Sequence, residues 1–201
     1  MRANLGMRFE AEPNRRIDIA YNSSSVPAFS VTECDAIIRW LEFRVGWHRT
    51  ALVEDIPGFG KCVRQCNVVK LQPHLIERVM DWLPRKLVGI IETLNREIWR
   101  FDITGLSEMH LLRYDVNDEV SLHADLDGDN CERKIALLTQ LSSPDDYMGG
   151  DLEYGIAPPA IASRERGAIL AFPAWVPHRV TPITRGTRYA ITCFALGPSF
   201  R

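Results

Sequence analysis

The spacing of hydrophobic residues along the chain changes from helical to alternating. A helix is predicted over residues 31–44, where Ser30 and Glu33 supply a capping box at its start. Apolar positions also recur at helical spacing from His74 to Trp99, where Pro84 is expected to open a second helix. The apolar positions of the first helix lie three or four residues apart: Cys34, Ile37, Ile38, Leu41 and Val45.

From residue 108 onward, short segments are separated by turn residues, which is typical of β-strands. Strands are predicted at 109–115, 120–126, 134–142, 151–155, 168–172, 178–183 and 188–196. The turns expected among them are 127–130, 148–150 and 185–186. Earlier in the chain, we expect a strand at 17–21, a loop or hairpin at 48–66 and a short strand at 68–71. Helices followed by strands predict an α+β fold, with helices on one face of a closed or sandwiched antiparallel sheet such as a jelly roll.

The 201 residues fit one domain. We divide it into a loose N-terminal segment (1–28), a mainly helical support (29–105) and a jelly-roll core (106–201). The hydrophobic share of 46% and charged share of 25% are ordinary for soluble proteins. A net charge of −2 argues against a nucleic-acid partner, and short basic clusters such as 164–166 are expected to be solvated.

The sequence contains no apolar run long enough to cross a bilayer and no continuous apolar segment of signal-peptide length at its start. We therefore expect no membrane partner and a cytoplasmic location. An odd number of scattered cysteines argues against a disulfide framework and suits a reducing compartment. These cysteines are Cys34, Cys62, Cys66, Cys131 and Cys193.

The most informative chemistry is a His-x-Asp tripeptide followed by a distant histidine. His123 and Asp125 lie two residues apart in a predicted strand, so their side chains are expected to share a face. His178 lies in a later predicted strand and could complete a set of two imidazoles and one carboxylate. Such a set leaves about three of six coordination positions open, as in non-haem Fe(II) oxygenases. Isolated histidines are more often structural, and we assign His48, His74 and His110 to that class.

Arg188 opens an alternating segment that reads as a buried strand. A buried arginine is costly without an anion, and its planar fork suits a carboxylate such as the far end of 2-oxoglutarate. Tyr114, nine residues before His123, could donate a hydrogen bond to the same carboxylate. The alternatives are an exposed arginine at a strand start and an ordinary core tyrosine. Arg179 and Arg185 are expected to be solvated.

Several linked stretches resemble the prolyl-4-hydroxylase-like branch of the Fe(II)/2-oxoglutarate dioxygenases. They are LLRYDVNDEVSLHADLD, RKIALLTQLSSPDDYMGGDLEY, GAILAFPAWVPHRVTPITRGTRYAITCFALGP and, more weakly, VRQCNVVKL. The resemblance covers about residues 66–200 and implies a double-stranded β-helix, or jelly roll of the cupin type. It implies His123, Asp125 and His178 as catalytic iron ligands. It also implies Arg188 and Tyr114 as partners of 2-oxoglutarate, and Thr192 could add a hydroxyl on the same strand face.

The resemblance further implies an oxidoreductase that hydroxylates an unactivated C–H bond while converting 2-oxoglutarate and dioxygen to succinate and carbon dioxide. Fe(II) would be the metal, with ascorbate as a reductant. A peptidyl prolyl residue, a free amino acid and a small metabolite all remain open as substrates. Valine at position 120, where the family often has an aromatic residue, points to an altered substrate pocket. An iron- and 2-oxoglutarate-binding sensor with little turnover, and a metal-binding cupin with other chemistry, are the alternatives.

Overall fold

The computed structural model describes residues 20–22, 27–44, 46–56, 60–126, 130–155 and 158–200. Helices occupy the first half of the chain and include α1 (Val31–Arg44), α2 (Pro73–Met80) and α3 (Trp82–Leu94), which continues into the π-helical turn η1 (Asn95–Trp99). The strands are β1 (Tyr21–Asn22), β2 (His48–Ile56), β3 (Gly60–Leu71), β4 (Gly105–Leu106), β5 (Met109–Tyr114), β6 (Glu119–His123), β7 (Arg133–Gln140), β8 (Tyr147–Gly149), β9 (Leu152–Tyr154), β10 (Ala160–Ile161), β11 (Ile169–Pro173), β12 (His178–Val180), β13 (Ile183–Gly186) and β14 (Arg188–Leu196).

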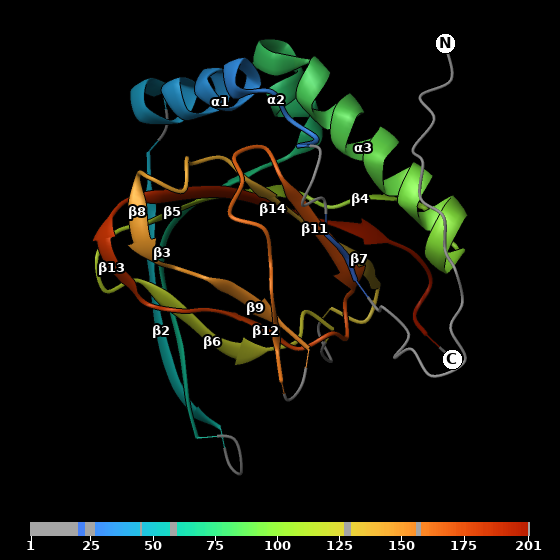
Figure 1. Cartoon of the computed structure of the whole chain (residues 1–201). Coiled ribbons are helices and arrows are strands. Elements are labelled where there is room, and N and C mark those ends of the chain that lie inside the picture. Colours follow the sequence, from blue (N-terminus) through green and yellow to red (C-terminus); the bar gives the residue numbers. More distant parts are fainter. Residues whose placement is uncertain are drawn as a thin grey trace.

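The strands form one strongly curved antiparallel sheet in the order β1-β11-β7-β14-β5-β3-β6-β12-β9-β10. Strand β3 connects the two halves of this sheet, because residues 67–71 pair with β5 while residues 64 and 65 pair with β6. One layer therefore runs from β1 to β5, with β14 between β7 and β5, and the other runs from β6 to β10 (Figure 1). This arrangement confirms the predicted α+β fold with a double-stranded β-helix.

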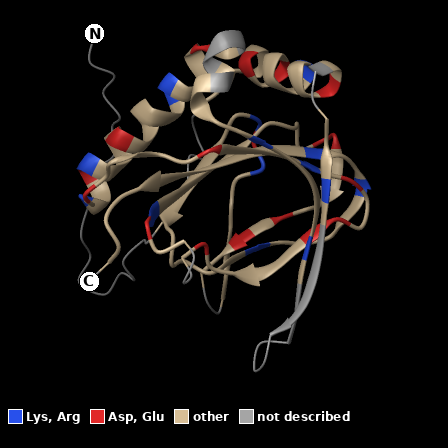
Figure 2. Ribbon diagram, turned by 180° about the vertical axis from the view of Figure 1, so that it is seen from behind, with Lys and Arg blue, Asp and Glu red and all other residues tan. Residues whose placement is uncertain are grey.

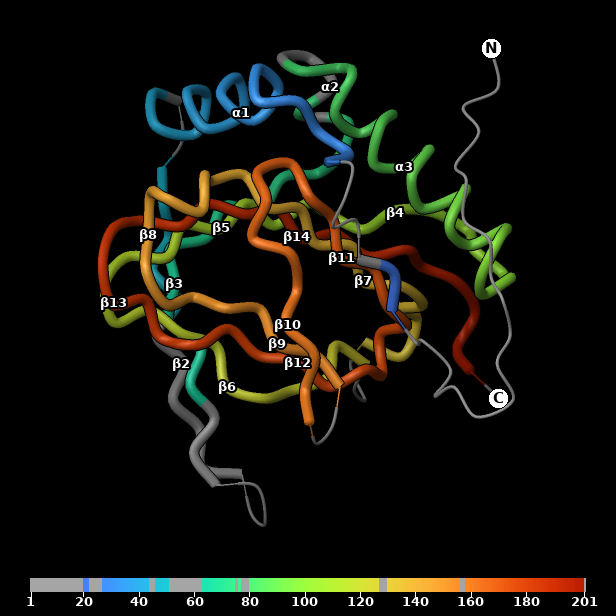
Figure 3. Tube along the Cα trace, viewed as in Figure 1, coloured from blue at the N-terminus to red at the C-terminus, as the bar shows by residue number. Residues whose placement is uncertain are grey.

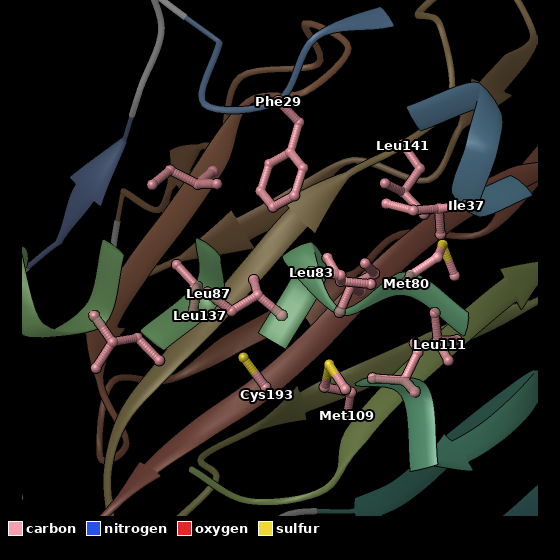
Figure 4. Close-up of a cluster of buried hydrophobic side chains, with 14 of the residues drawn as sticks. Phe29, Ile37, Met80, Leu83, Leu87, Met109, Leu111, Leu137, Leu141 and Cys193 are labelled. Carbon is pink, nitrogen blue, oxygen red and sulfur yellow. The ribbon is translucent and has the colours of Figure 1, made fainter. Parts of the chain in front are cut away.

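The helices cover the outer face of the layer that contains β5, β14 and β7, as Figure 1 shows. Leu83 and Leu87 of α3 and Ile37 of α1 are fully buried against that face. Figure 4 shows how these side chains meet Leu111, Leu137 and Cys193 from the strands. The main hydrophobic core therefore lies between the helices and the outer face of the sheet. The inner face can then carry polar side chains without interrupting this core.

Polar contacts stabilise the start of the first helix and attach the helix to the barrel. The predicted capping box is present: the Ser30 amide donates to the Glu33 carboxylate, and the Glu33 amide donates to the Ser30 hydroxyl. Arg166 joins the helix to the sheet by donating to Asp35 at 2.6 Å and to the carbonyl of Leu141 at 2.8 Å. The prediction that the basic cluster 164–166 is solvated is therefore wrong for Arg166, which is half-buried in a structural ion pair.

Several element boundaries differ from the sequence prediction. The helical region divides at Asp81, so Pro84 lies within the first turn of α3 instead of opening it. The expected turns at 148–150 and 185–186 are largely the paired strands β8 and β13. Strands β2 and β3 pair with each other over a long stretch, which agrees with the hairpin alternative for 48–66, so the barrel also includes strands from the segment expected to be a mainly helical support. Residues 17–19 of the expected first strand lie outside the described residues.

Other predictions from composition can be compared with the described part of the chain. Its cysteines 34, 66, 131 and 193 are all free thiols. None of the described helices has the length and apolar character needed to span a bilayer. Figure 2 shows acidic and basic residues of both signs along the helices, as the near-neutral balance of the sequence suggests. The tube in Figure 3 shows the helices α1, α2 and α3 lying along one side of the strands.

Candidate metal centre

The structure brings His123, Asp125 and His178 together inside the barrel. His123 ends β6 and is the pairing partner of His178, which begins β12. The His123 Nε2 atom lies 3.6 Å from Oδ1 of Asp125, and the His178 Nε2 atom lies 3.5 Å from Oδ2. One donor atom from each of the three residues falls within 4.8 Å of the others. The predicted convergence of these side chains is thus what the structure shows.

Asp125 reaches this position by a route that strand alternation does not describe. Strand β6 ends at His123, so Asp125 lies beyond the ladder in the segment that follows. Its backbone amide donates to the carbonyl of Ala174 at 2.9 Å, and the carbonyl of Asp125 accepts from Arg133 at 3.3 Å. These contacts hold the carboxylate against the two imidazoles.

The three side chains have the chemistry of a metal-binding set. Nδ1 of His123 lies 2.9 Å from the carbonyl of Ser121, and Nδ1 of His178 lies 3.1 Å from the carbonyl of Val176. Because a carbonyl only accepts, each Nδ1 carries the proton and each Nε2 offers a lone pair to the site. Oδ2 of Asp125 is buried without a hydrogen-bond partner. A cation between these atoms would satisfy it, so the residues fit a divalent metal.

The protonation states also suit metal binding at neutral pH. Burial lowers the pKa of the His178 imidazole to about 4, although the charge of Asp125 acts in the opposite direction. For Asp125, burial alone would raise the pKa, but the neighbouring His123, His178 and Arg133 together lower it. At pH 7, the site therefore holds a neutral imidazole beside an ionised carboxylate, the forms that bind metals.

The lowered pKa of His178 predicts a pH-dependent stability of the metal-free protein. Between pH 6.5 and about 4, the unfolded chain binds a proton that folded His178 does not, so the free energy of unfolding falls as the pH falls through this window. The expected loss is on the order of 3 kcal/mol. Chemical denaturation across this range, with a chelator present, measures it. His178→Gln should flatten the dependence and His48→Gln should retain it, whereas equal slopes in both variants would contradict the assignment.

A pocket lies beside the three converging residues, between the two layers of the barrel. It brings together residues of β3, β5, β6, β7, β12 and β14. Val120, the position where the sequence departs from the family pattern, contributes to its wall, as do Tyr114 and Thr192. The remaining lining residues are Arg64, Cys66, His110, Leu112, Arg133, Leu138, Val180 and Phe194, together with the three of the candidate centre.

Arg188 lies behind this pocket, at the start of β14. Its Cα is paired with that of Tyr114, and its guanidinium carbon lies 5.2 Å from the centre of the tyrosine ring. The side chain is only 4% exposed, and its Nε donates to Oε1 of Gln140 at 3.0 Å. Among the residues that the structure describes, no carboxylate forms an ion pair with it. Arg188 and Gln140 line a second, smaller cavity, and Leu138 borders both spaces.

Sequence reasoning missed several pocket residues. His110, assigned to the structural histidines, lines the pocket directly, and Arg64, Cys66 and Arg133 were not considered for it. The alternation of side chains along β3, β5 and β7 could have indicated these residues, but only once the inner face of each strand is known.

Comparison with known proteins finds a matching family model and relatives of similar sequence. The family model of the 2OG-Fe(II) oxygenase superfamily matches residues 109–196. A PKHD-type hydroxylase of Synechococcus sp. (strain JA-2-3B'a(2-13)) is 45% identical over 57 residues, which cover 28% of this chain and 25% of that protein. A PKHD-type hydroxylase of Gloeothece citriformis (strain PCC 7424) is 27% identical over 147 residues, covering 71% of this chain and 60% of that protein. The chain thus aligns with less than two thirds of either relative.

Solved structures share the fold at low sequence identity. A prolyl hydroxylase from Trichoplax adhaerens, in complex with a peptide fragment of the hypoxia inducible factor, superposes with a TM-score of 0.67 at 18% identity. The match covers 88% of this chain and 82% of that protein. A prolyl-4-hydroxylase of Pseudomonas putida superposes with a TM-score of 0.57 at 17% identity, covering 83% and 100% of the two chains. The barrel therefore has the fold of these prolyl hydroxylases, and its residues 109–196 match the model of the 2OG-Fe(II) oxygenase superfamily.

Proposed function

We propose that this protein is an Fe(II)- and 2-oxoglutarate-dependent hydroxylase that uses His123, Asp125 and His178 as its metal ligands. The observation that carries the proposal is the buried, unpartnered Oδ2 of Asp125, which faces two imidazoles whose tautomers are already fixed. Two nitrogen ligands and one oxygen ligand leave open positions for a chelating co-substrate and dioxygen. When bound, Fe(II) would supply the redox chemistry that couples decarboxylation of 2-oxoglutarate to hydroxylation of a C–H bond.

The remaining residues receive roles from their positions. Arg188 would bind the far carboxylate of 2-oxoglutarate, because a buried guanidinium with no acidic partner needs an anion. Tyr114, which is buried between Arg188 and the pocket, would hold the co-substrate by its hydroxyl group. Thr192 lines the pocket next to His110 and would add a second hydroxyl. Ascorbate would act from solution by keeping the iron reduced.

The substrate we propose is a small molecule or a segment of peptide. A structural neighbour from Trichoplax adhaerens is described with a bound peptide fragment, which supports a peptidyl prolyl group as one candidate. A free amino acid or small metabolite is the other, since Val120 at the pocket wall is smaller than the aromatic residue expected there. Buried free thiols at Cys34, Cys66 and Cys193 support a reducing, cytoplasmic setting.

The test is an assay of succinate formation. Protein loaded anaerobically with Fe(II) is exposed to air with 2-oxoglutarate and ascorbate, first alone and then with prolyl peptides and free amino acids. We expect succinate in amounts that rise with a suitable substrate, together with a product heavier by one oxygen atom. Binding of iron and 2-oxoglutarate without succinate under any condition would instead favour the sensor function.

A further inference from the structure

We propose that the substrate of this pocket carries a carboxylate group and that Arg64 on β3 recognises it. This inference rests on the proposed function, because it assigns a substrate class to the same site. It adds a specificity residue that neither the metal ligands nor the groups facing 2-oxoglutarate include. The carboxylate can belong to a free amino acid or other small acid, or to an acidic side chain in a peptide.

The first argument is the direction in which Arg64 faces. Side chains alternate along a strand, so positions 64, 66 and 68 of β3 share one face. Cys66 on this face belongs to the buried cluster inside the barrel together with Tyr114 and Val120, which identifies it as the inner face. Arg64 continues the same row, at the point where β3 leaves β5 and pairs with Val120 of β6. Its side chain lines the pocket and is exposed to solvent, so Arg64 lies at the open side of the pocket.

The second argument is that Arg64 acts on the functional groups of the pocket. Burial raises the pKa of the Tyr114 hydroxyl, and the positive charges of Arg188 and Arg64 oppose that rise. Arg64 also lines the same pocket as His123, Asp125 and His178. The guanidinium therefore shares this space with the candidate metal centre and lies within electrostatic reach of Tyr114.

The third argument is that Arg64 lacks a counter-charge. Within the described ranges it forms no ion pair or hydrogen bond through its side chain, although acidic partners hold Arg49, Arg164 and Arg179 elsewhere on the barrel. Arg133, the other pocket arginine, is already engaged with the carbonyl of Asp125 and the ring of Phe194. Arg64 is thus the pocket cation best placed to receive a ligand.

Charge balance in the loaded site supports the same conclusion. A divalent metal and the dianion 2-oxoglutarate offset each other, and the charges of Asp125 and Arg188 do so as well. Two pocket arginines then remain, of which Arg133 is held at the carbonyl of Asp125, so the charge available to a ligand is that of Arg64. A carboxylate on the substrate would neutralise it through a bidentate, charge-assisted pair. A neutral substrate would leave the mouth of the pocket positively charged.

The experiment compares acids with their amides. Protein loaded with Zn(II) and 2-oxoglutarate, which cannot turn over, is titrated calorimetrically with free amino acids and with the corresponding carboxamides. A second arm uses prolyl peptides that contain glutamate or glutamine beside the proline, so the two arms distinguish a free acid from an acidic side chain. In at least one arm, we expect the acid to bind about 10- to 100-fold more tightly than its amide.

Variants show whether Arg64 is responsible. Arg64→Gln should remove the preference for the acid, and Arg64→Lys should retain part of it. The affinity for 2-oxoglutarate should change less than about twofold in both, because Arg188 is assigned to that anion. Arg179→Gln is the matched control. It removes the same charge from the outer face of β12, which is separated from β3 by β6, and it should keep the full preference.

The outcomes separate this inference from the proposed function. If the unmodified chain binds neither metal nor 2-oxoglutarate, the proposed function fails and the inference fails with it. If it binds both but no acid binds more tightly than its amide, the inference alone is overturned. The inference is also overturned if Arg64→Gln lowers the affinity for 2-oxoglutarate as much as the affinity for the acid, because Arg64 would then bind the co-substrate.

Discussion

Replacing Asp125 with alanine is expected to lower the affinity for divalent metal by more than about 100-fold and to abolish succinate formation. Loss of a residue that merely orients a ligand already costs about 10- to 100-fold in metal affinity, and Asp125 is the only carboxylate proposed as a direct ligand. Both of its oxygens face imidazole nitrogens at 3.5–3.6 Å, so no other described carboxylate can take its place. Calorimetric titration of the metal-free protein with Zn(II) measures the affinity.

A carboxylate outside the site provides the control for this variant. Asp145 is exposed in the turn before β8, so Asp145→Ala removes the same charge while leaving the candidate centre intact. It should bind metal like the unmodified protein. Retention of full affinity by Asp125→Ala, with a normal unfolding transition, would show that the metal binds elsewhere.

Replacing Arg188 with leucine should weaken co-substrate binding strongly without a comparable loss of stability. The dissociation constant for 2-oxoglutarate is expected to rise at least about 30-fold, since truncating one partner of a buried charge pair costs roughly 2–5 kcal/mol. In the ligand-free protein, by contrast, the substitution removes a buried guanidinium that has no acidic partner among the described residues. Its free energy of unfolding should fall by less than about 1 kcal/mol or should rise.

Two further variants sharpen this prediction. Arg188→Lys keeps the charge but loses the planar fork, so its affinity for 2-oxoglutarate should fall between those of the unmodified protein and the leucine variant. Arg185→Gln alters an exposed arginine of β13 and should leave both quantities unchanged. Parallel losses of affinity and stability in Arg188→Leu would indicate that the arginine is a structural residue.

The sequence was most informative where local pattern and tertiary structure agree. The helix from 31 to 44 has its own capping box and apolar stripe, so its bounds in the structure are the predicted ones. The strand β14 was likewise predicted at 188–196, from its alternating pattern, and these are its bounds in the structure. Nothing local joins His123 and His178 across 55 residues, so the strand patterns could only suggest the pair and the resemblance to a known family strengthened it.

Elements that depend on distant partners were harder to predict. Strands β8 and β13 look like turns because each contains glycine, and they form a ladder only with each other. Gly149 and Gly186 have φ angles of 71° and 76°, and a Cβ at either position would meet a backbone oxygen within 2.1 Å. Arg64 could not be assigned to the pocket from sequence because its orientation depends on β3 joining both layers of the barrel.

The position of β14 inside the sheet has a consequence for how the chain folds during synthesis. Although β14 leaves the ribosome after all the other described strands, it fills the gap between β7 and β5. Until then, both neighbours present unpaired backbone groups, and open strand edges of this kind promote association between chains. We therefore expect nascent chains that stop before residue 188 to depend on chaperones, with release coinciding with insertion of the final strand.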